Sequence, residues 1–115
     1  MSVRIEPNDL IEATERRVFG YVVTSSPETG PHLRAVVFTA VDGRLTARVG
    51  KQTATNVARA GSVTLLWPPM EPLNQRDEYD DYSVIADCSA ACVEAGDSFT
   101  LSATPLGAVW HRPAR

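Results

Sequence analysis

Apolar and polar residues alternate along most of this chain, which is the pattern of β-strands with one buried face. The clearest case is the segment 44–49, in which every second residue is apolar. Asp42-Gly43, just before it, is a strong signal for a two-residue hairpin. We therefore predict six strands, at residues 18–24, 32–41, 44–49, 62–67, 82–93 and 99–109.

Two short segments have a helical pattern instead. Asn8 is expected to cap a first helix that turns Leu10 and Thr14 inward, and residues 52–60 predict a second helix that Gly61 ends. The order is then helix, three strands, helix, three strands, and the hairpins favour antiparallel pairing. Six strands in one domain of 115 residues predict a mainly β fold in which an antiparallel barrel is closed or partly closed.

Composition limits the class of protein. The chain is 43% hydrophobic and 22% charged, which favours an ordered fold over disorder. We find no apolar run of roughly 18 residues and no apolar stretch of a signal peptide, so we expect a soluble, cytoplasmic protein without a membrane contact. The formal net charge of -3 argues against a nucleic-acid partner.

Charge is unevenly distributed along the chain. Residues 34–59 hold five basic residues and one acidic residue, whereas 71–81 hold five acidic residues and one basic residue. The basic segment suggests a small anionic ligand, and a chance partition of surface charge explains it equally well. The acidic segment is interpreted as part of a loop, 70–81, that is too polar for the core.

Motifs for known chemistry are few. Cys88 and Cys92, four residues apart on one strand, stand too far apart for a disulfide and form no metal site by themselves. His32 and His111, the two histidines, are interpreted as structural or surface groups before catalytic bases. We therefore assign no catalytic residue and no metal ligand.

The most suggestive segment is 48–56, where a strand enters Gly50 and a helix then begins with Lys51, Gln52 and Thr53. Free backbone N–H groups at a helix N-terminus form an anion site, to which these side chains add donors. If the Asp42-Gly43 hairpin extends along both strands, Arg34 lies opposite Lys51. The pair then either binds a phosphate or simply faces water.

Four segments carry a resemblance to a known family: GPHLRAVVF at 30–38, DG at 42–43, TARVGKQTATNV at 46–57 and SVTLLWP at 62–68. In sequence and order they resemble the pyridoxamine 5'-phosphate oxidase-like, FMN-binding split-barrel proteins, and residues 82–113 are similar more loosely. The resemblance implies a six-stranded antiparallel split barrel with two short helices, spanning residues 1–115. It also implies a homodimer with one FMN in each of two clefts at the subunit interface.

The resemblance further implies the cofactor-binding residues. Arg34 matches the strand arginine that binds the FMN phosphate, and Lys51, Gln52 and Thr53 occupy the position of the polar-basic triplet that opens the helix. Backbone groups of the second and third strands hold the flavin ring in that family, here represented by the cofactor-binding candidates Val36 and Thr46.

Two departures from the family pattern matter. The triplet lacks one cation and has another displaced by a residue, so phosphate affinity is expected to be weaker or the ligand different. Arg34→Ala and Lys51→Ala are each expected to weaken FMN binding by roughly 1 to 3 kcal/mol. The sequence ends at Arg115 without the further basic segment of the oxidase proper, so we do not expect oxidation of pyridoxamine phosphate.

Taken with the resemblance, the residues favour an FMN-dependent oxidoreductase with an unassigned small-molecule redox substrate. A reductase that binds the deazaflavin F420 is an alternative, with Arg44, Arg48 and Arg59 lining a groove for its acidic tail. A dimer that binds flavin or tetrapyrrole without turnover is another, as is a dimer that has lost its ligand.

Overall fold

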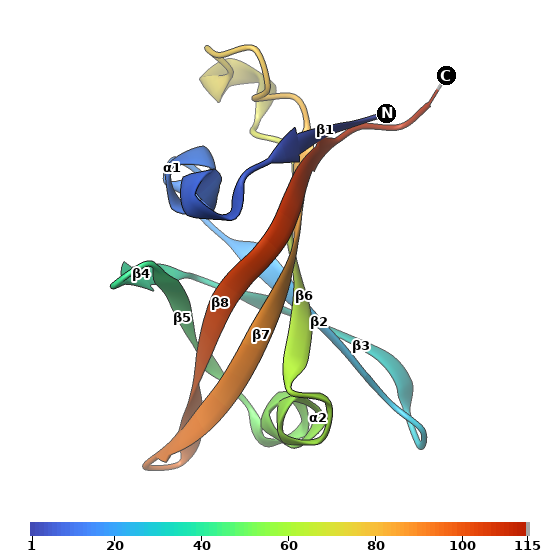
Figure 1. The fold of residues 1–115 in the computed structure, drawn as a ribbon, viewed down its shortest axis with the longest axis vertical. Helices are drawn as coiled ribbons and strands as arrows, with labels where there is room; N and C mark the ends of the chain where they lie inside the picture. Colours follow the sequence, from blue (N-terminus) through green and yellow to red (C-terminus); the bar gives the residue numbers. More distant parts are fainter. Residues whose placement is uncertain (115) are drawn as a thin grey trace.

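Antiparallel strands wind around one another in a single sheet that curls into a barrel (Figure 1). The structure is a computed structural model and describes residues 1–114. Within these residues the elements, in chain order, are β1 (Ser2–Ile5), the 3₁₀ helix η1 (Pro7–Asp9), α1 (Leu10–Thr14), β2 (Gly20–Ser26), β3 (Gly30–Val36), β4 (Thr39–Val41), β5 (Arg44–Val49), α2 (Lys51–Ala60), β6 (Ser62–Trp67), the 3₁₀ helix η2 (Pro72–Asn74), β7 (Ser83–Ala95) and β8 (Ser98–His111).

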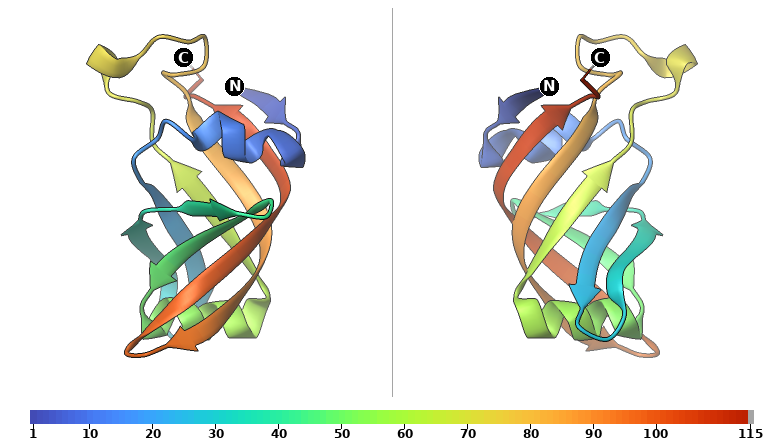
Figure 2. Two further views of the ribbon diagram at one scale, coloured as in Figure 1. Left: turned by 90° about the vertical axis from the view of Figure 1, so that its left-hand side faces the viewer. Right: turned by 90° about the vertical axis from the view of Figure 1, so that its right-hand side faces the viewer.

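The strand order is β3-β2-β6-β7-β8-β5-β4, and β1 pairs with β8 beside this path. The two ends of the order, β3 and β4, do not pair with each other in the described part of the chain, so the barrel has an open seam. Figure 2 shows α2 lying across one end of the barrel. The predicted class is confirmed: a mainly β, antiparallel split barrel with two short α-helices.

The sheet of residues 1–114 has eight strands where six were expected. One of the two additional strands, β1, is four residues long and pairs with the end of β8. The other arises because the expected strand 32–41 is divided into β3 and β4 around Val37 and Phe38. At this bend the ring of Phe38 packs against Trp67 of the core, with the ring centroids 5.0 Å apart.

The hairpin between β4 and β5 forms as predicted. Val41 pairs with Arg44, and both turn residues have positive φ, 50° at Asp42 and 77° at Gly43. Positive φ at both central residues is the geometry of a type I′ turn, which glycine adopts without strain. Helix α2 also ends as predicted, at Gly61, whose φ of 69° is left-handed.

The core lies inside the barrel and takes the inward residues of almost every strand. Its fully buried members include Val22, Leu65, Trp67, Val84 and Leu101, and Leu10 of α1 covers one end. Burying each such side chain stabilises the fold by about 1.5–3 kcal/mol. The first helix is shorter than the sequence suggests, because Asn8 lies in η1 and α1 has no side-chain cap.

Close packing at Gly20 joins this core to the bend at Phe38. A Cβ atom on Gly20 would lie 2.8 Å from the Leu66 carbonyl oxygen and 2.9 Å from Cε2 of Phe38. Both distances are shorter than van der Waals contact, so only glycine fits at the start of β2 without a shift of its neighbours.

The acidic loop is more ordered than its composition predicts. Asp80 is only 4% exposed, and its carboxylate accepts backbone N–H groups of Arg76 (2.8 Å) and Asp77 (2.9 Å) and a guanidinium N–H of Arg16 (2.5 Å). Burial alone would raise the pKa of Asp80, but these hydrogen bonds and the charge of Arg16 hold it well below its usual range. The expectation that this loop is too polar for the interior is wrong at Asp80.

Other expectations concern the thiols and membrane contact. Cys88 is buried, Cys92 is half-buried, and both thiols are free. Neither helix in residues 1–114 has the length and apolar character that crossing a membrane would require.

Candidate functional site

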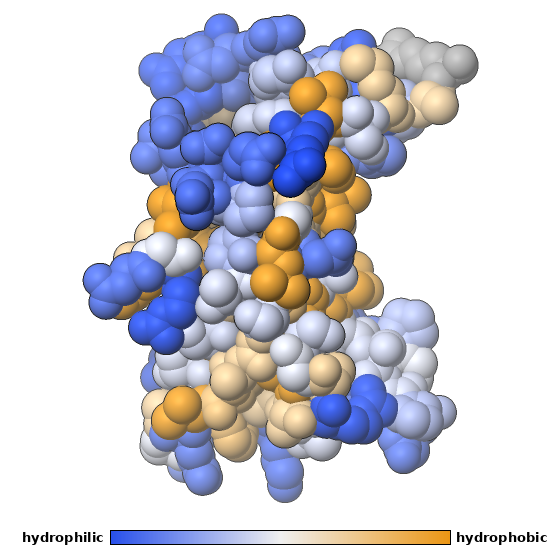
Figure 3. All heavy atoms as spheres, in the orientation of Figure 1, coloured by the Kyte–Doolittle hydropathy of each residue, from blue (hydrophilic) through white to orange (hydrophobic). Residues whose placement is uncertain are grey.

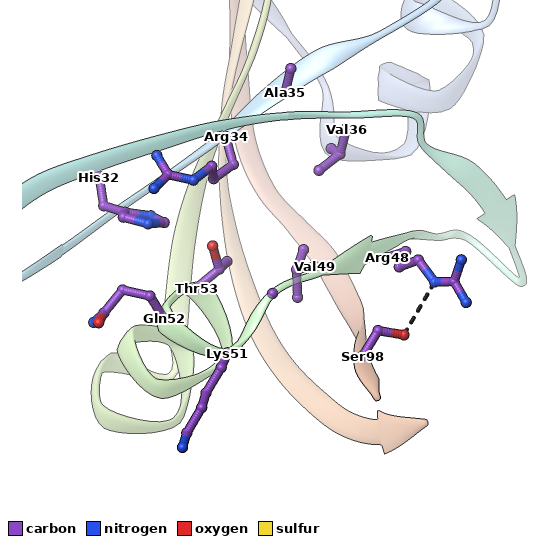
Figure 4. A pocket seen from close by; sticks show the side chains of 11 residues that line it. His32, Arg34, Ala35, Val36, Arg48, Val49, Lys51, Gln52, Thr53 and Ser98 are labelled. Carbon is purple, nitrogen blue, oxygen red and sulfur yellow. Dashed lines mark hydrogen bonds between the residues drawn. The ribbon is translucent and has the colours of Figure 1, made fainter. Parts of the chain in front are cut away.

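A cleft of about 520 Å³ lies at the open seam of the barrel (Figure 4). It is bounded by β3, by the second half of β5 and by the first turn of α2. The lining residues are His32, Arg34, Ala35, Val36, Arg48, Val49, Gly50, Lys51, Gln52, Thr53 and Ser98. Five of the six cofactor-binding candidates from the sequence are among them, and Thr46 is not.

The strand pairing explains why a cleft forms here. Strand β3 pairs with β2 alone within residues 1–114, so its other edge is free. Strand β5 pairs with β4 only through residues 44–46, while residues 47–49 pair with β8 on one side. The two free edges face the seam, and alternate residues on each present backbone N–H and C=O groups that no ladder uses.

The first turn of α2 supplies further free donors. Gly50 precedes the helix and has no side chain to cap it, and the first intrahelical bond runs from the Ala54 N–H to the Gly50 carbonyl (3.1 Å). The backbone N–H groups of Lys51, Gln52 and Thr53 therefore precede the first helical hydrogen bond. Together with the helix dipole they make this end of the cleft suited to an anion.

Thr53 and Arg34 add side-chain donors to the same end. Thr53 is 1% exposed, and Figure 4 shows its hydroxyl pointing toward Arg34. The Arg34 guanidinium extends over the cleft, and its Nη1 donates to the Leu33 carbonyl (2.7 Å). The structure thus brings these two predicted site residues to the same cleft, and their role in binding a ligand stays a prediction.

Lys51 differs from what the sequence suggests. It lines the cleft, but Figure 4 shows its amine pointing away from Arg34. The β4–β5 hairpin has the predicted register, but its ladder ends at the Thr39–Thr46 pair and does not reach Arg34 and Lys51, because the chain bends at Val37 and Phe38 and β3 pairs with β2. The two residues reach one cleft through the curvature of the barrel.

Two of the other candidates have side chains that are bound elsewhere. The Gln52 amide nitrogen donates to Oδ1 of Asn56 (2.9 Å), so this side chain follows the helix. The Thr46 hydroxyl donates to the Thr39 carbonyl (3.1 Å), across the β4–β5 pair. Gln52 can still contribute its backbone N–H to the cleft, and the role of Thr46 stays a prediction.

His32, which the sequence analysis interprets as a structural or surface group, lines the cleft. Its Nδ1 atom is buried and has no hydrogen-bond partner in the described part of the chain. Burial, and secondarily the charge of Arg34, lowers the pKa of its imidazole, so the ring is neutral at neutral pH. The spacing was the available signal, because residues two apart on a strand share a face and His32 precedes Arg34 by two.

The cleft is positively charged. Its lining includes Arg34, Arg48 and Lys51 and contains no carboxylate among the described residues. The broader basic groove expected for F420 is not assembled, since Arg48 alone of its three arginines lines the cleft. Arg44 lies at the tip of the β4–β5 hairpin, and Arg59 donates to the Ser25 carbonyl.

A metal centre is not part of this arrangement. Within residues 1–114, no three His, Cys, Asp or Glu side chains lie close enough together to hold a metal ion. The donors in the cleft are instead backbone amides, a hydroxyl, guanidinium groups and an imidazole. That set suits an anionic organic ligand.

Comparison with known proteins gives a limited match in sequence. No protein-family model matches this chain. Two uncharacterised proteins, from Mycobacterium bovis and Mycobacterium tuberculosis, are each 36% identical to it over 69 residues. The match covers 57% of this chain and 44% of each relative, so the chain spans less than half the length of these relatives.

Solved structures match over nearly the whole chain. An F420 reductase superposes with a TM-score of 0.63 at 13% identity, covering 85% of this chain and 94% of its own. A candidate pyridoxamine 5'-phosphate oxidase from Listeria innocua also gives 0.63, at 16% identity, over 90% and 96%. HutZ, the heme storage protein from Vibrio cholerae, gives 0.65 at 13% identity, over 92% and 94%. At these identities the match shows a shared split-barrel fold, which confirms the resemblance at that level.

Proposed function

We propose that this chain binds a phosphate-bearing flavin cofactor, FMN in the first instance, in the seam cleft and acts as an FMN-dependent oxidoreductase on a small-molecule substrate. One observation carries the proposal. Arg34, Thr53 and the uncapped first turn of α2 converge on a cleft whose described lining holds no carboxylate. Proteins that share the fold include ones named for pyridoxamine 5'-phosphate oxidation and F420 reduction, which supports a flavin before other phosphate ligands.

The residues present fit such a group. A phosphate would take the free N–H groups of the α2 first turn together with Arg34. A flat ring would lie against Val36 and Val49, and the free backbone edges of β3 and β5 would hydrogen-bond its polar rim. The cleft volume of about 520 Å³ lies within the range of small-molecule sites.

The cofactor and the chain would contribute different parts of the chemistry. A bound flavin would supply the transfer of hydride or of single electrons, for which no side-chain acid or base is needed. The chain's own contribution is to fix the phosphate through Arg34 and the helix N-terminus and to keep water from the ring with Val36 and Val49. Binding energy at the phosphate end would thus orient the reactive end.

A second copy of this chain is part of the proposal. The cleft is open on one side, and apolar residues are exposed beside it: Val37, which follows β3, is 67% exposed, and Val41 in β4 is also exposed. Figure 3 shows apolar atoms at the surface midway along the molecule, below the hydrophilic end that holds α1 and the acidic loop. A homodimer would cover such residues and close the cleft, and light scattering would measure its mass.

One observation favours F420 as a second candidate. Arg48 lines the cleft at the side away from Arg34, where its Nε donates to Oγ of Ser98 (3.1 Å) (Figure 4). A cation on the side of the cleft opposite the proposed phosphate position could bind the acidic tail of F420, which FMN lacks. Arg48→Met would then weaken F420 binding and leave FMN binding nearly unchanged.

The test begins with the purified full chain. Its visible spectrum reports any flavin retained from expression, and titration with FMN, riboflavin and F420 gives the preference among them. The proposal expects saturable FMN binding that is tighter than riboflavin binding, followed by reduction and reoxidation of the bound flavin. A colourless protein that binds neither FMN nor F420 would refute it, while stable binding without turnover would support a non-catalytic flavin-binding dimer instead.

A further inference from the structure

His32 lies in the wall of the seam cleft, beside the proposed phosphate position. It belongs to β3, on the same face as Arg34. Figure 4 shows its ring directed into the cleft, between Arg34 above and Gln52 below. Nδ1 is buried without a hydrogen-bond partner, and it is the one such side-chain atom found in residues 1–114. A buried polar atom left unpaired in this way points to a partner that arrives with a ligand.

The polar side chains around His32 are already committed to one another. Thr24 lies directly across from it on β2, and the Thr24 hydroxyl accepts a hydrogen bond from Nδ2 of Asn56 (3.0 Å). Oδ1 of Asn56 in turn accepts from the Gln52 amide (2.9 Å). This Gln52–Asn56–Thr24 chain leaves His32 outside it, so the imidazole is available to a ligand.

The charged residues that line the cleft with His32 are all basic. Arg34 lies on its own strand and is the one whose charge acts on the ring, while Lys51 of α2 and Arg48 of β5 line the cleft with their charged ends directed elsewhere. From β2 its neighbour is the uncharged Thr24, and none of the described residues lining the cleft is a carboxylate. With no anion of the protein beside it, the ring would find its counter-charge in a bound phosphate.

We propose that His32 is a phosphate-binding residue of this cleft and that it takes up a proton as an anionic phosphate group binds. The inference rests on the proposed function, since it assumes a phosphate-bearing ligand in the seam. His32 would thereby supply a positive charge that the start of α2 lacks, where Gln52 and Thr53 are neutral and the Lys51 amine points away.

The sign of the pH dependence follows from the two states. In the free protein, burial and the charge of Arg34 lower the pKa of His32, so the ring is neutral at neutral pH. A phosphate dianion beside the ring would raise that pKa, so binding takes up a proton. Affinity must then fall as the pH rises from the pKa of His32 in the free protein through its higher pKa in the complex.

The test measures FMN binding by flavin fluorescence from about pH 6.5 to about pH 8.5, where a phosphate monoester remains largely dianionic. We expect the Kd of the unaltered protein for FMN to rise about tenfold over this range. His32→Gln, which keeps a polar side chain but cannot gain a proton, should show a nearly flat profile and match the unaltered protein at the high-pH end. Riboflavin, which lacks the phosphate, should bind both proteins without this pH dependence.

His111→Gln is the matched control, because it makes the same change at the other histidine of the sequence. His111 lies at the far end of the barrel, where its Nδ1 hydrogen-bonds Oγ of Ser2 (3.0 Å). Its FMN profile should keep the pH dependence of the unaltered protein. Calorimetry in two buffers of different ionisation enthalpy should count up to one proton taken up with FMN, and none with His32→Gln.

The outcomes separate the two proposals. If FMN binds with the same pH dependence in His32→Gln as in the unaltered protein, or if riboflavin shows that dependence too, His32 does not bind the phosphate, and the flavin site itself stands. If neither FMN nor riboflavin binds the unaltered protein, the proposed function fails, and the assignment of His32 falls with it.

Discussion

Replacing Arg34 and Lys51 separately by Met distinguishes two cations that the sequence treats as equivalent. Arg34 extends over the cleft, whereas the amine of Lys51 points away from it (Figure 4). A charge-assisted hydrogen bond to phosphate contributes about 1.5–3 kcal/mol, and exposure of Arg34 to solvent reduces this to about 1–2 kcal/mol. Arg34→Met should therefore raise the Kd for FMN by roughly 5- to 30-fold.

Lys51→Met should have a much smaller effect. The substitution keeps the backbone N–H at the first position of α2, which is the part of Lys51 that we expect to bind phosphate. Only a screened, longer-range attraction is lost, so the change should stay below about 0.5 kcal/mol, or roughly twofold in Kd. For Lys51 this is less than the roughly 1 to 3 kcal/mol that the sequence predicts for each of the two cations.

The assay is a titration of each variant with FMN, followed by flavin fluorescence at fixed pH and ionic strength. Arg44→Met serves as the control for a lost positive charge, because Arg44 is exposed at the β4–β5 hairpin and does not line the cleft. Riboflavin serves as the control ligand, and thermal unfolding verifies that each variant is folded.

Two results would refute the reasoning. If Lys51→Met weakens FMN binding as much as Arg34→Met does, the side-chain directions in the cleft do not decide which cation binds. If Arg34→Met weakens riboflavin binding by the same factor as FMN binding, Arg34 does not act on the phosphate.

Three further predictions concern stability and reactivity. Gly20→Ala should lower the free energy of unfolding in urea by about 1–3 kcal/mol, because its Cβ would meet a backbone oxygen at 2.8 Å, whereas Gly107→Ala, with nothing within 4 Å, should change it far less. Asp80→Asn should cost about 2–3 kcal/mol at neutral pH through its charged hydrogen bonds. Because folding lowers the pKa of Asp80, its contribution in the unaltered protein should be complete above roughly pH 5, should begin to decline below about pH 4 and should be lost only as the pH approaches the lowered pKa of the folded state, as measured by urea unfolding at acid pH. Burial raises the pKa of Cys88 to about 12, so in Cys92→Ser the remaining thiol should react with a thiol reagent only after unfolding, and rapid reaction of the folded variant would contradict this.

Much of the fold could be predicted from local pattern. The alternation in 44–49 gave β5, the run 62–67 gave β6, and Gly61 ended α2, because each of these features acts within a few residues. The turn at Asp42 and Gly43 was predictable for the same reason. These elements depend on backbone preferences that hold wherever the segment lies.

The elements that were missed depend on distant partners. Strand β1 is too short to show an alternation of apolar and polar residues. It forms because residues 2–5 pair with β8, more than 100 positions later in the chain. The buried position of Asp80 was equally hidden, since an acidic loop gives no sign that Arg16 will lie beside one of its carboxylates. Such features are decided by tertiary contacts and leave no local pattern.

The candidate site, like the fold, was predicted only in part from the sequence. Resemblance and the helix start were enough to identify Arg34 and the first turn of α2, because backbone position fixes where they lie. The direction of the Lys51 amine and the unpaired Nδ1 of His32 depend on neighbouring side chains, which spacing alone does not specify. The sequence therefore indicated the cleft and left open which side chains act in it.

The bend at Val37 and Phe38 is what makes a cleft at all. Had residues 32–41 continued as one strand paired with β5, the backbone groups that now face the seam would have been used in a ladder, and Arg34 would have lain on a closed sheet. At the bend the Phe38 ring packs on Trp67 and approaches the space that a side chain on Gly20 would occupy, and Gly20 pairs with Val36, which lines the cleft. Core packing at the start of β2 and the proposed ligand site at the end of β3 therefore meet at one aromatic ring, so we expect Gly20→Ala to weaken FMN binding as well as destabilise the fold.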